Sequence, residues 1–189
     1  VLRDGTSVSK KQISDKDFQK AYALSRQFGF PIAVETDNGI FVNELNPIVI
    51  ELARLVDHPV PPVIDIEKEF VEGKCCQLCF YCDEETEKEV MAQLPNLSAS
   101  RWHPIFADIN VKGVDKASGI REFASYYDFD ISHTIAFGDG GNDISMLREA
   151  GIGIAMGGAA ESIRAVSDYV TDTVDNDGIR NALIHFGII

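Results

Sequence analysis

Hydrophobic and polar positions follow two different patterns along the chain, and the change falls near Lys112. Before it, alternating apolar runs predict strands, and helical spacing predicts helices between them. The expected strands are 32–35, 40–42, 74–82, 98–102 and 105–111, and the expected helices are 15–28, 47–56 and 84–94. Asp37-Asn38-Gly39 between the first two strands is a hairpin signal. This part therefore predicts a mixed α+β domain with an antiparallel sheet.

From Lys112 onward, helices and short strands alternate. This order is typical of parallel βαβ crossovers. The expected helices are Lys116–Tyr127, Ile144–Ala150, Ala160–Val166 and Asp177–Phe186, with Asp177 as an N-cap, and the expected strands are Thr134–Phe137, Ile152–Met156 and Tyr169–Val170. Three such strands are few for an independent α/β domain, so we expect further strands outside this chain. The fold class is α/β, with domains at 1–110 and 111–189.

Composition narrows the possible functions. The chain has 189 residues, of which 45% are apolar and 25% charged, so it can bury a core. A formal net charge of −13 argues against nucleic-acid binding, which needs a basic face. It also implies that an anionic substrate is attracted by local cations. The apolar runs are too short to span a membrane, so no membrane partner is expected.

Four cysteines crowd together at positions 75, 76, 79 and 82. Such spacing can hold zinc or an iron–sulfur cluster. The segment Lys74–Cys82 nevertheless reads as a strand, in which Cys75 and Cys79 share one face and Cys76 and Cys82 share the other. Residues four apart on a strand face are separated by about 13 Å, too far to share a metal. We therefore expect buried, reduced thiols in a cytoplasmic protein, with a metal cluster or disulfides as the alternative.

The hexapeptide Gly138–Asp143 (GDGGND) follows the apolar run that predicts a buried strand. Its glycines let the backbone approach a ligand closely. Asp139, Asn142 and Asp143 are expected to project from the turn at the carboxyl end of the strand, where open α/β sheets bind ligands. Carboxylate oxygens suit Mg²⁺, which in such sites bridges a substrate phosphate. The alternative is a glycine-rich turn whose Asp and Asn residues cap a helix.

The residues from Lys112 onward resemble the C-terminal core of the haloacid dehalogenase-like (HAD) superfamily, specifically its Cof-type phosphatases. The matching motifs are Gly113–Lys116 (GVDK), GDGGND, Met146-Leu147, Gly151–Gly157 (GIGIAMG) and Tyr169–Thr171. The preceding part is similar to the mixed α/β cap domain of that group. The resemblance implies a partial Rossmann-like core with a parallel sheet, plus a cap that determines substrate specificity.

The resemblance also implies a reaction. In that family an aspartate attacks phosphorus to give an aspartyl-phosphate, and a second aspartate acts as general acid and base. A lysine neutralises the phosphoryl group beside a Mg²⁺ site, as expected where charge stabilisation dominates catalysis. By this likeness, Lys116 would be the catalytic lysine, Asp139 would bind Mg²⁺, Asp143 would support it, and Asn142 would contact the substrate or its phosphate. Taken alone, Lys116 also fits a solvated lysine at a helix start.

The nucleophile motif of the family, Asp-x-Asp-Gly-Thr after an apolar strand, is not matched. Residues 2–6 read Leu-Arg-Asp-Gly-Thr, so Leu2 stands where the attacking aspartate is required. We instead expect Asp4-Gly5 to form a hairpin turn that leads into Ser7-Val8. The nucleophile segment is then expected before Val1, and the chain by itself is expected to be inactive or nearly so.

These observations favour a Mg²⁺-dependent phosphatase of small phosphorylated metabolites, with sugar phosphates among the candidates. The alternatives are a truncated, non-catalytic module that binds a phosphorylated ligand or a partner protein, and a cysteine–metal protein. Glu35, Trp102 and His103 of the expected cap are candidates for contact with the leaving group, although Trp and His at such positions are more often core or rim. A homo-oligomer would also fit, because absent strands would leave a face to cover.

Overall fold

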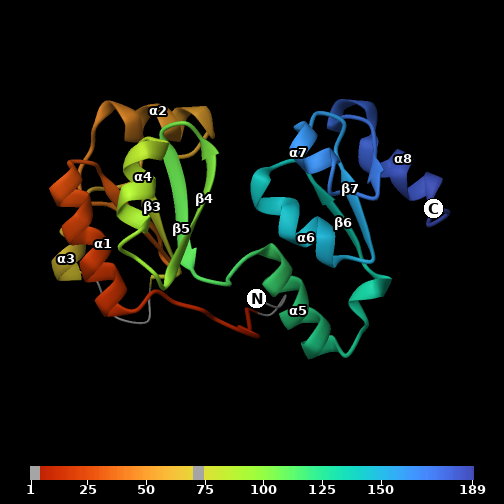
Figure 1. Cartoon of the computed structure of the whole chain (residues 1–189), viewed down its shortest axis with the longest axis horizontal. Helices are drawn as coiled ribbons and strands as arrows, with labels where there is room; N and C mark the ends of the chain where they lie inside the picture. Colours follow the sequence, from red (N-terminus) through yellow and green to blue (C-terminus); the bar gives the residue numbers. More distant parts are fainter. Residues whose placement is uncertain (1–4, 70–74) are drawn as a thin grey trace. The chain divides into compact units, whose positions relative to one another are not determined.

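The computed structural model describes residues 5–69 and 75–189. The chain divides into two units, each with its own sheet. The antiparallel unit spans Lys10–Gly113, and the parallel unit comprises Val114–Ile189 with the described residues before Lys10 (Figure 1). The change of unit lies between Gly113 and Val114. Within the described ranges, every helix is too short or too polar to cross a membrane.

The sheet of the antiparallel unit has the strand order β2-β1-β3-β5-β4, and each neighbouring pair is antiparallel. The strands are β1 (Ile32–Thr36), β2 (Gly39–Val42), β3 (Gln77–Phe80), β4 (Leu97–His103) and β5 (Phe106–Val111). The predicted hairpin is confirmed, with Thr36 opposite Gly39. Gly39 has a φ of 123°, which a glycine adopts without steric cost.

Helices α1 (Asp15–Phe28), α2 (Pro47–Leu55), α3 (Ile66–Glu69) and α4 (Glu84–Met91) belong to the same unit. The Ser14 side chain caps α1 by accepting a hydrogen bond from the Asp17 N–H, and Gly29 ends this helix in the left-handed region. Asp83 caps α4 by accepting from the Thr86 N–H. The predicted start and end of α1 and the predicted start of α4 are confirmed.

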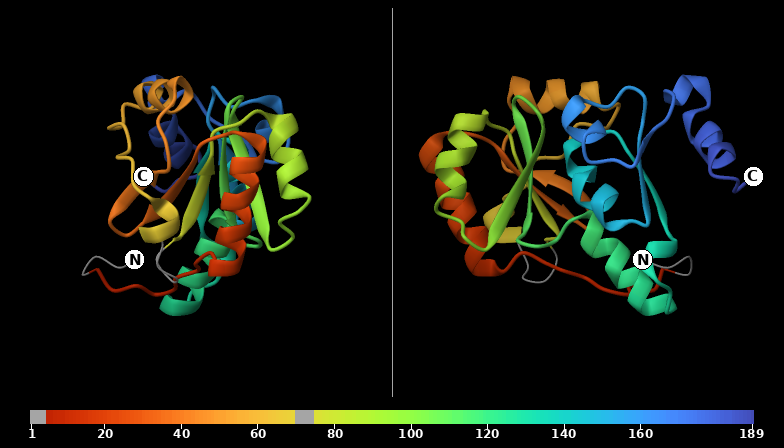
Figure 2. Two further views of the ribbon diagram at one scale, coloured as in Figure 1. Left: turned by 90° about the vertical axis from the view of Figure 1, so that its left-hand side faces the viewer. Right: turned by 45° about the vertical axis from the view of Figure 1, so that its right-hand side comes forward.

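Each face of the antiparallel sheet has its own hydrophobic cluster. One face packs against α1 and α4, where Phe18, Phe80 and Val90 are fully buried (Figures 1 and 2). The other face packs against α2 through Ala33, Val42, Val49, Leu52, Cys79, Tyr81 and Phe106. The second cluster is smaller, and it borders the pocket described below.

The predicted distribution of the cysteines over the two faces is wrong. Cys75 and Cys82 lie in the cluster beneath α1 and α4, whereas Cys79 lies in the cluster beneath α2. Strand alternation fails because β3 covers only Gln77–Phe80, so Cys75 precedes the strand; Lys74 lies outside the described residues. The predicted burial is confirmed for these three cysteines, whereas Cys76 is half-buried. Burial raises the pKa of Cys82 to about 11, so its thiol stays protonated at neutral pH.

The parallel unit contains the sheet β6-β7-β8, with both neighbouring pairs parallel. The elements are α5 (Lys116–Tyr127), β6 (Ile135–Gly138), α6 (Ile144–Glu149), β7 (Ile152–Ala155), α7 (Glu161–Arg164), β8 (Tyr169–Val170) and α8 (Gly178–His185), with 3₁₀ turns at Ile131–His133, Gly141–Asp143 and Val174–Asn176. The predicted alternation of helix and parallel strand is confirmed. Helix α6 lies along β6 and β7 and buries Leu147 against them (Figure 1).

Two local predictions are wrong. Asp177 precedes α8, but its backbone is left-handed (φ 57°) and its side chain makes no capping hydrogen bond. A capping side chain normally requires an extended backbone at this position. Ser7-Val8 is not a strand, because no described strand pairs with it. These two residues group with the parallel unit. The Asp4 half of the proposed hairpin turn lies outside the described residues.

Candidate active site

The GDGGND turn lies at the carboxyl edge of the parallel sheet. Strand β6 ends at Gly138, which is in register with Ala155 at the end of β7. Ala155 in turn is in register with Val170 at the end of β8. The loops that leave the three strands therefore start at one edge, the edge at which open α/β sheets bind their ligands. The 3₁₀ turn Gly141–Asp143 carries the chain from this edge into α6.

Asp143 does not project from the turn as predicted. It is only 4% exposed, and its carboxylate is folded back onto the backbone of the turn. Oδ2 accepts hydrogen bonds from the N–H groups of Asp139 and Gly140, each at 3.0 Å. Oδ1 accepts a hydrogen bond from the Lys116 ammonium group. Asp143 therefore fixes the shape of the turn and the position of the lysine together.

These contacts determine the ionisation of Asp143. Burial alone would raise the pKa of its carboxyl group, because the charged form is poorly solvated. The hydrogen bonds from Lys116 and from the Gly140 and Asp139 amides outweigh this effect and hold the pKa below its ordinary value. Asp143 is therefore a carboxylate at neutral pH, and its negative charge is matched by the lysine.

Lys116 reaches this carboxylate from the first turn of α5. Asp115 begins that helix by accepting a hydrogen bond from the Ser118 N–H at 2.7 Å, and Lys116 is the next residue. The Lys116 side chain remains 48% exposed although it is paired with Asp143. Since an ammonium group has three donors, the exposed side can bind an anion while the pair stays intact.

Two glycines of the turn lie close to polar side chains, and at Gly138 the close packing requires a glycine. A Cβ on Gly138 would lie 2.5 Å from the Cβ of Asp143. A Cβ on Gly140 would lie 2.8 Å from the Oδ1 atom of Asn142. Both glycines therefore leave space for the polar side chains that the turn gathers, whereas Gly141 has no neighbour within 4 Å of such a Cβ.

Asp139 is the more open of the two predicted metal ligands. It is exposed, and its carboxylate has no hydrogen-bond partner among the described residues. The described residues contain no group of three or more His, Cys, Asp or Glu side chains suited to a metal. One open carboxylate with a second one behind it nevertheless fits Mg²⁺, which binds through one or two carboxylates, water and phosphate oxygens.

The predicted site residues are distributed over the two units. Lys116 and Asp143 are 27 residues apart in the chain and form a direct ion pair, and Asp139 and Asn142 belong to the same turn. Glu35 and Trp102 lie in the antiparallel unit and line a pocket there. His103 does not line that pocket.

Comparison with known proteins agrees with this geometry. The family of haloacid dehalogenase-like hydrolases matches residues 2–183, which is most of the chain. The chain belongs to the haloacid dehalogenase-like hydrolases. The resemblance that the motifs indicated is thereby confirmed.

Solved structures of HAD proteins cover the whole chain. BT1666 from Bacteroides thetaiotaomicron, described among phosphatases of the superfamily, is 56% identical with a TM-score of 0.94, and the match covers 100% of this chain and 70% of that chain. BT4131, described as an HAD subclass IIB sugar phosphatase, is 36% identical with a TM-score of 0.90, and the match covers 100% and 72%. Both the antiparallel and the parallel unit thus have counterparts in HAD phosphatases.

Curated HAD relatives match over a shorter length. YcsE of Bacillus subtilis (strain 168), named as a 5-amino-6-(5-phospho-D-ribitylamino)uracil phosphatase, is 33% identical over 107 residues, which are 55% of this chain and 43% of that protein. YkrA of the same organism is 40% identical over 121 residues, which are 64% of this chain and 47% of that protein. The chain therefore matches less than half the length of either relative.

Proposed function

We propose that this chain provides the cap and the lysine–aspartate part of the active site of a Mg²⁺-dependent phosphatase that acts on small phosphorylated metabolites. In this proposal Lys116 neutralises the phosphoryl group and Asn142 contacts the substrate or its phosphate. Asp139 binds Mg²⁺ and Asp143 supports the metal site. The observation that carries the proposal is the ion pair between Lys116 and the buried Asp143 at the carboxyl edge of the parallel sheet.

The chemistry of phosphoryl transfer supports these roles. Charge accumulates on the equatorial oxygens of the transferring group, and fixed cations stabilise it most when they need not reorganise. The Lys116 ammonium is held in place by a carboxylate that is itself held by two backbone amides. Mg²⁺, when bound, supplies a second positive charge to the phosphoryl oxygens.

Asp143 contributes to this site by positioning. Its two oxygens already accept from Lys116, Asp139 and Gly140, so its support of the metal is exerted through the turn that carries Asp139. The family mechanism uses a further carboxylate as nucleophile, and the proposal assigns that role to none of these four residues. The proposed function is therefore that of the complete phosphatase, of which this chain contributes the residues named here.

The proposed substrate class agrees with the names of the relatives. YcsE is named for a ribitylamino-uracil phosphate, and BT4131 is described as a sugar phosphatase. Both names denote hydrolysis of a phosphate monoester on a small polar molecule. We extend only this common class to the present protein.

The test is a phosphatase assay on the protein produced from its complete reading frame, with p-nitrophenyl phosphate and Mg²⁺. We expect turnover that chelation of Mg²⁺ abolishes, and a loss of about 100-fold or more in kcat/KM for Asp139→Asn. Asp128→Asn is the matched control, because Asp128 ends α5 at the opposite end from Lys116 in a left-handed conformation that Asn also adopts. It should retain full activity.

The same assay can refute the proposal. Turnover that is independent of Mg²⁺, or equal loss in the two variants, would exclude the proposed metal role of Asp139. Absence of turnover together with saturable phosphate binding would favour the non-catalytic binding module instead. A panel of phosphate monoesters then identifies the substrate among those that are hydrolysed.

A further inference from the structure

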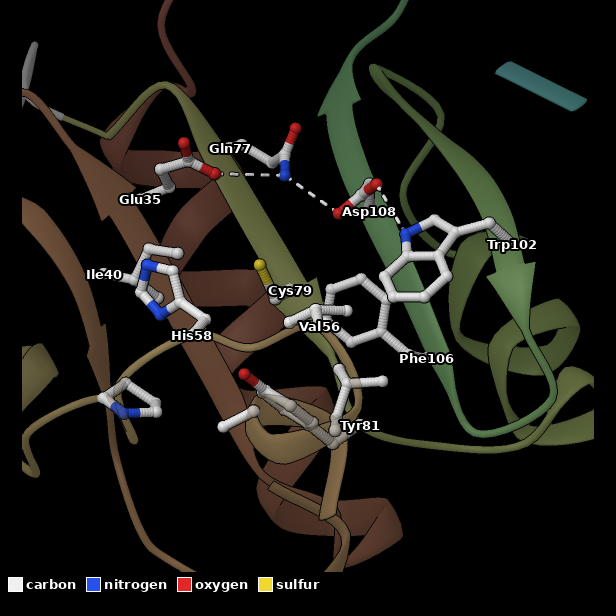
Figure 3. Close-up of a pocket in the computed structure, with 13 residues that line it drawn as sticks. Glu35, Ile40, Val56, His58, Gln77, Cys79, Tyr81, Trp102, Phe106 and Asp108 are labelled. Carbon is white, nitrogen blue, oxygen red and sulfur yellow. Dashed lines mark hydrogen bonds between the residues drawn. The ribbon is translucent and has the colours of Figure 1, made fainter. Parts of the chain in front are cut away.

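A pocket of about 300 Å³ opens in the antiparallel unit, on the sheet face that packs against α2 (Figure 3). Its floor consists of Cys79, Tyr81 and Phe106, all of which are buried. Leu52, Val56 and the loop after α2 form an apolar wall. A mostly apolar cavity of this size with a few convergent polar groups is typical of a small-molecule site.

A row of polar side chains crosses one end of the pocket (Figure 3). Strand register places Glu35 of β1 opposite Gln77 of β3, and Asp108 of β5 opposite Cys79. The Gln77 amide donates to Glu35 Oε2 at 3.2 Å and to Asp108 Oδ1 at 2.9 Å. Trp102 Nε1 donates to the second Asp108 oxygen at 3.2 Å. The side-chain donors of Gln77 and Trp102 are therefore directed at the two carboxylates.

The other polar groups of the pocket offer acceptors. The Tyr81 hydroxyl points into the pocket and has no hydrogen-bond partner among the described residues, although Tyr81 is only 6% exposed (Figure 3). His58 Nδ1 lies 2.8 Å from the Pro59 carbonyl oxygen, which can only accept, so Nδ1 carries a hydrogen. In the neutral ring Nε2 is then an acceptor. The described lining contains neither lysine nor arginine.

Negative charge at this end of the pocket is not compensated by a cation in the described lining. The pKa of Asp108 is raised to about 6, mainly by burial; the hydrogen bond from Trp102 opposes this rise and the nearby Glu35 carboxylate adds to it. Burial likewise raises the pKa of the Tyr81 hydroxyl, which therefore stays neutral. A positively charged ligand would relieve the repulsion between the two carboxylates.

We propose that this pocket binds a small organic cation, a primary ammonium group carried on an apolar or aromatic skeleton. An ammonium group has donors only, and the pocket presents the carboxylates of Glu35 and Asp108 as acceptors. The rings of Trp102 and Phe106, with centroids 5.2 Å apart, provide faces for the cation and for the apolar part of the ligand.

Other ligand classes fit the pocket less well. An anion would face two carboxylates without a lysine or arginine to bind it. A polyhydroxylated ligand needs several donors as well as acceptors from the protein; the donors of Gln77 and Trp102 are already used, and the Tyr81 hydroxyl offers one. The proposed site uses residues of the antiparallel unit alone, and it goes beyond the proposed phosphatase activity.

The chain contains its own probe for this site, because Trp102 is its single tryptophan. We would titrate the 189-residue chain with phenethylamine, phenethyl alcohol and hydrocinnamate, following Trp102 fluorescence and confirming affinities by calorimetry. The amine should bind about tenfold more tightly than the alcohol, as a charge-assisted hydrogen bond does. The carboxylate should not saturate. Equal affinity of amine and alcohol, or tighter binding of the carboxylate, would overturn the proposal.

Substitutions in the pocket test where the ammonium group of the ligand binds. Glu35→Gln keeps the shape of the side chain and should weaken amine binding about tenfold. Glu89→Gln, an equal change of charge at an exposed position outside the pocket, should leave affinity unchanged. Unchanged affinity in Glu35→Gln refutes the site. If a variant fails to fold by circular dichroism, the three-ligand comparison on the unaltered chain decides. No phosphate is involved, so failure here is distinct from failure of the phosphatase proposal.

Discussion

Two partly or fully buried aspartates, one in each unit, have pKa values shifted in opposite directions. Asp143 of the parallel unit has its pKa held low, and Asp108 of the antiparallel unit has its pKa raised to about 6. Both carboxylates accept hydrogen bonds on both oxygens. Burial raises both pKa values, and both carboxylates are occupied on both oxygens, so the difference must come from the donors and neighbours.

The charge of the donors and neighbours explains it. Asp143 receives a lysine ammonium and two backbone amides, whereas Asp108 receives only neutral donors from Gln77 and Trp102. Glu35 adds a second negative charge beside Asp108. The Asp143 carboxylate is thus neutralised by Lys116 and holds that lysine in place. The Asp108 carboxylate has no cationic partner among the described residues and can attract a cation from outside the chain.

The largest expected effect on stability comes from removing the Asp143 carboxylate. Asp143→Ala deprives the Asp139 and Gly140 amides and the Lys116 ammonium of their shared acceptor. We expect a loss of about 3 kcal/mol in the free energy of unfolding, measured by urea denaturation. Asp139→Ala is the control, since Asp139 is exposed, and it should cost less than about 0.5 kcal/mol. Equal losses would show that Asp143 does not organise the turn.

The second prediction tests how closely Gly138 packs against Asp143. Gly138→Ala places a Cβ 2.5 Å from the Asp143 Cβ and should destabilise the protein by about 2 kcal/mol. Gly141→Ala, in the same turn, adds a Cβ with no neighbour within 4 Å and should change stability by less than about 0.5 kcal/mol. A thermal unfolding series of both variants checks this, and a harmless Gly138→Ala would contradict the close packing.

A smaller effect is expected in the pH dependence of stability. The pKa of Asp108 rises from 3.8 to about 6 on folding, so the folded state holds a proton that the unfolded chain releases. The contribution of this group is therefore complete below about pH 4 and lost as the pH rises through about 6. Asp108→Asn should remove this loss. Between these pH values, the free energy of unfolding of the variant should therefore fall about 1 kcal/mol less than that of the parent, with allowance for the partial exposure of Asp108.

Urea unfolding of the parent and Asp108→Asn proteins at several pH values measures this difference directly. Other groups titrate in both proteins and cancel in the subtraction. A difference that is independent of pH would show that the pKa of Asp108 is not raised on folding, so that the two aspartates would not have opposite pKa shifts. A difference of opposite sign would show that Asp108 is stabilised as an anion.

The smallest effect concerns Glu35. Glu35→Gln keeps an oxygen that can accept from Gln77 and removes one of the two negative charges. At neutral pH it should stabilise the chain slightly, by about 0.5 kcal/mol or less, because the other charge is no longer opposed. The same exchange at the paired carboxylate, Asp143→Asn, should be destabilising. Chemical denaturation measures both stability changes. Changes of opposite sign would support the contrast between the two carboxylate sites, and changes of the same sign would contradict it.

Much of the fold could be predicted because its signals are local. Ser14 and Gly29 at the ends of α1 and the hairpin at Asp37–Gly39 each depend on residues close together in the chain. The GDGGND turn and its position after a strand were likewise predictable from adjacent residues. The candidate metal and lysine residues were then indicated by the order of their motifs.

Local patterns fail where a contact joins distant residues or a strand ends early. The face occupied by Cys75 depends on where β3 begins, which neighbouring strands decide. The inward turn of Asp143 depends on Lys116, far away in the chain. Gln77 and Asp108 escaped sequence analysis altogether, because only the pairing of β1, β3 and β5 places them beside Glu35.

The sequence by itself determined the elements, the family and the acidic turn, because caps, turns and apolar periodicity act over a few residues. The tertiary structure alone decided which carboxylate meets a cation. Sheet register and helix packing set the distances between side chains that are far apart in the chain, and electrostatic energies depend on those distances and on burial. For that reason Asp143 and Asp108, the same residue type, have opposite pKa shifts in one molecule.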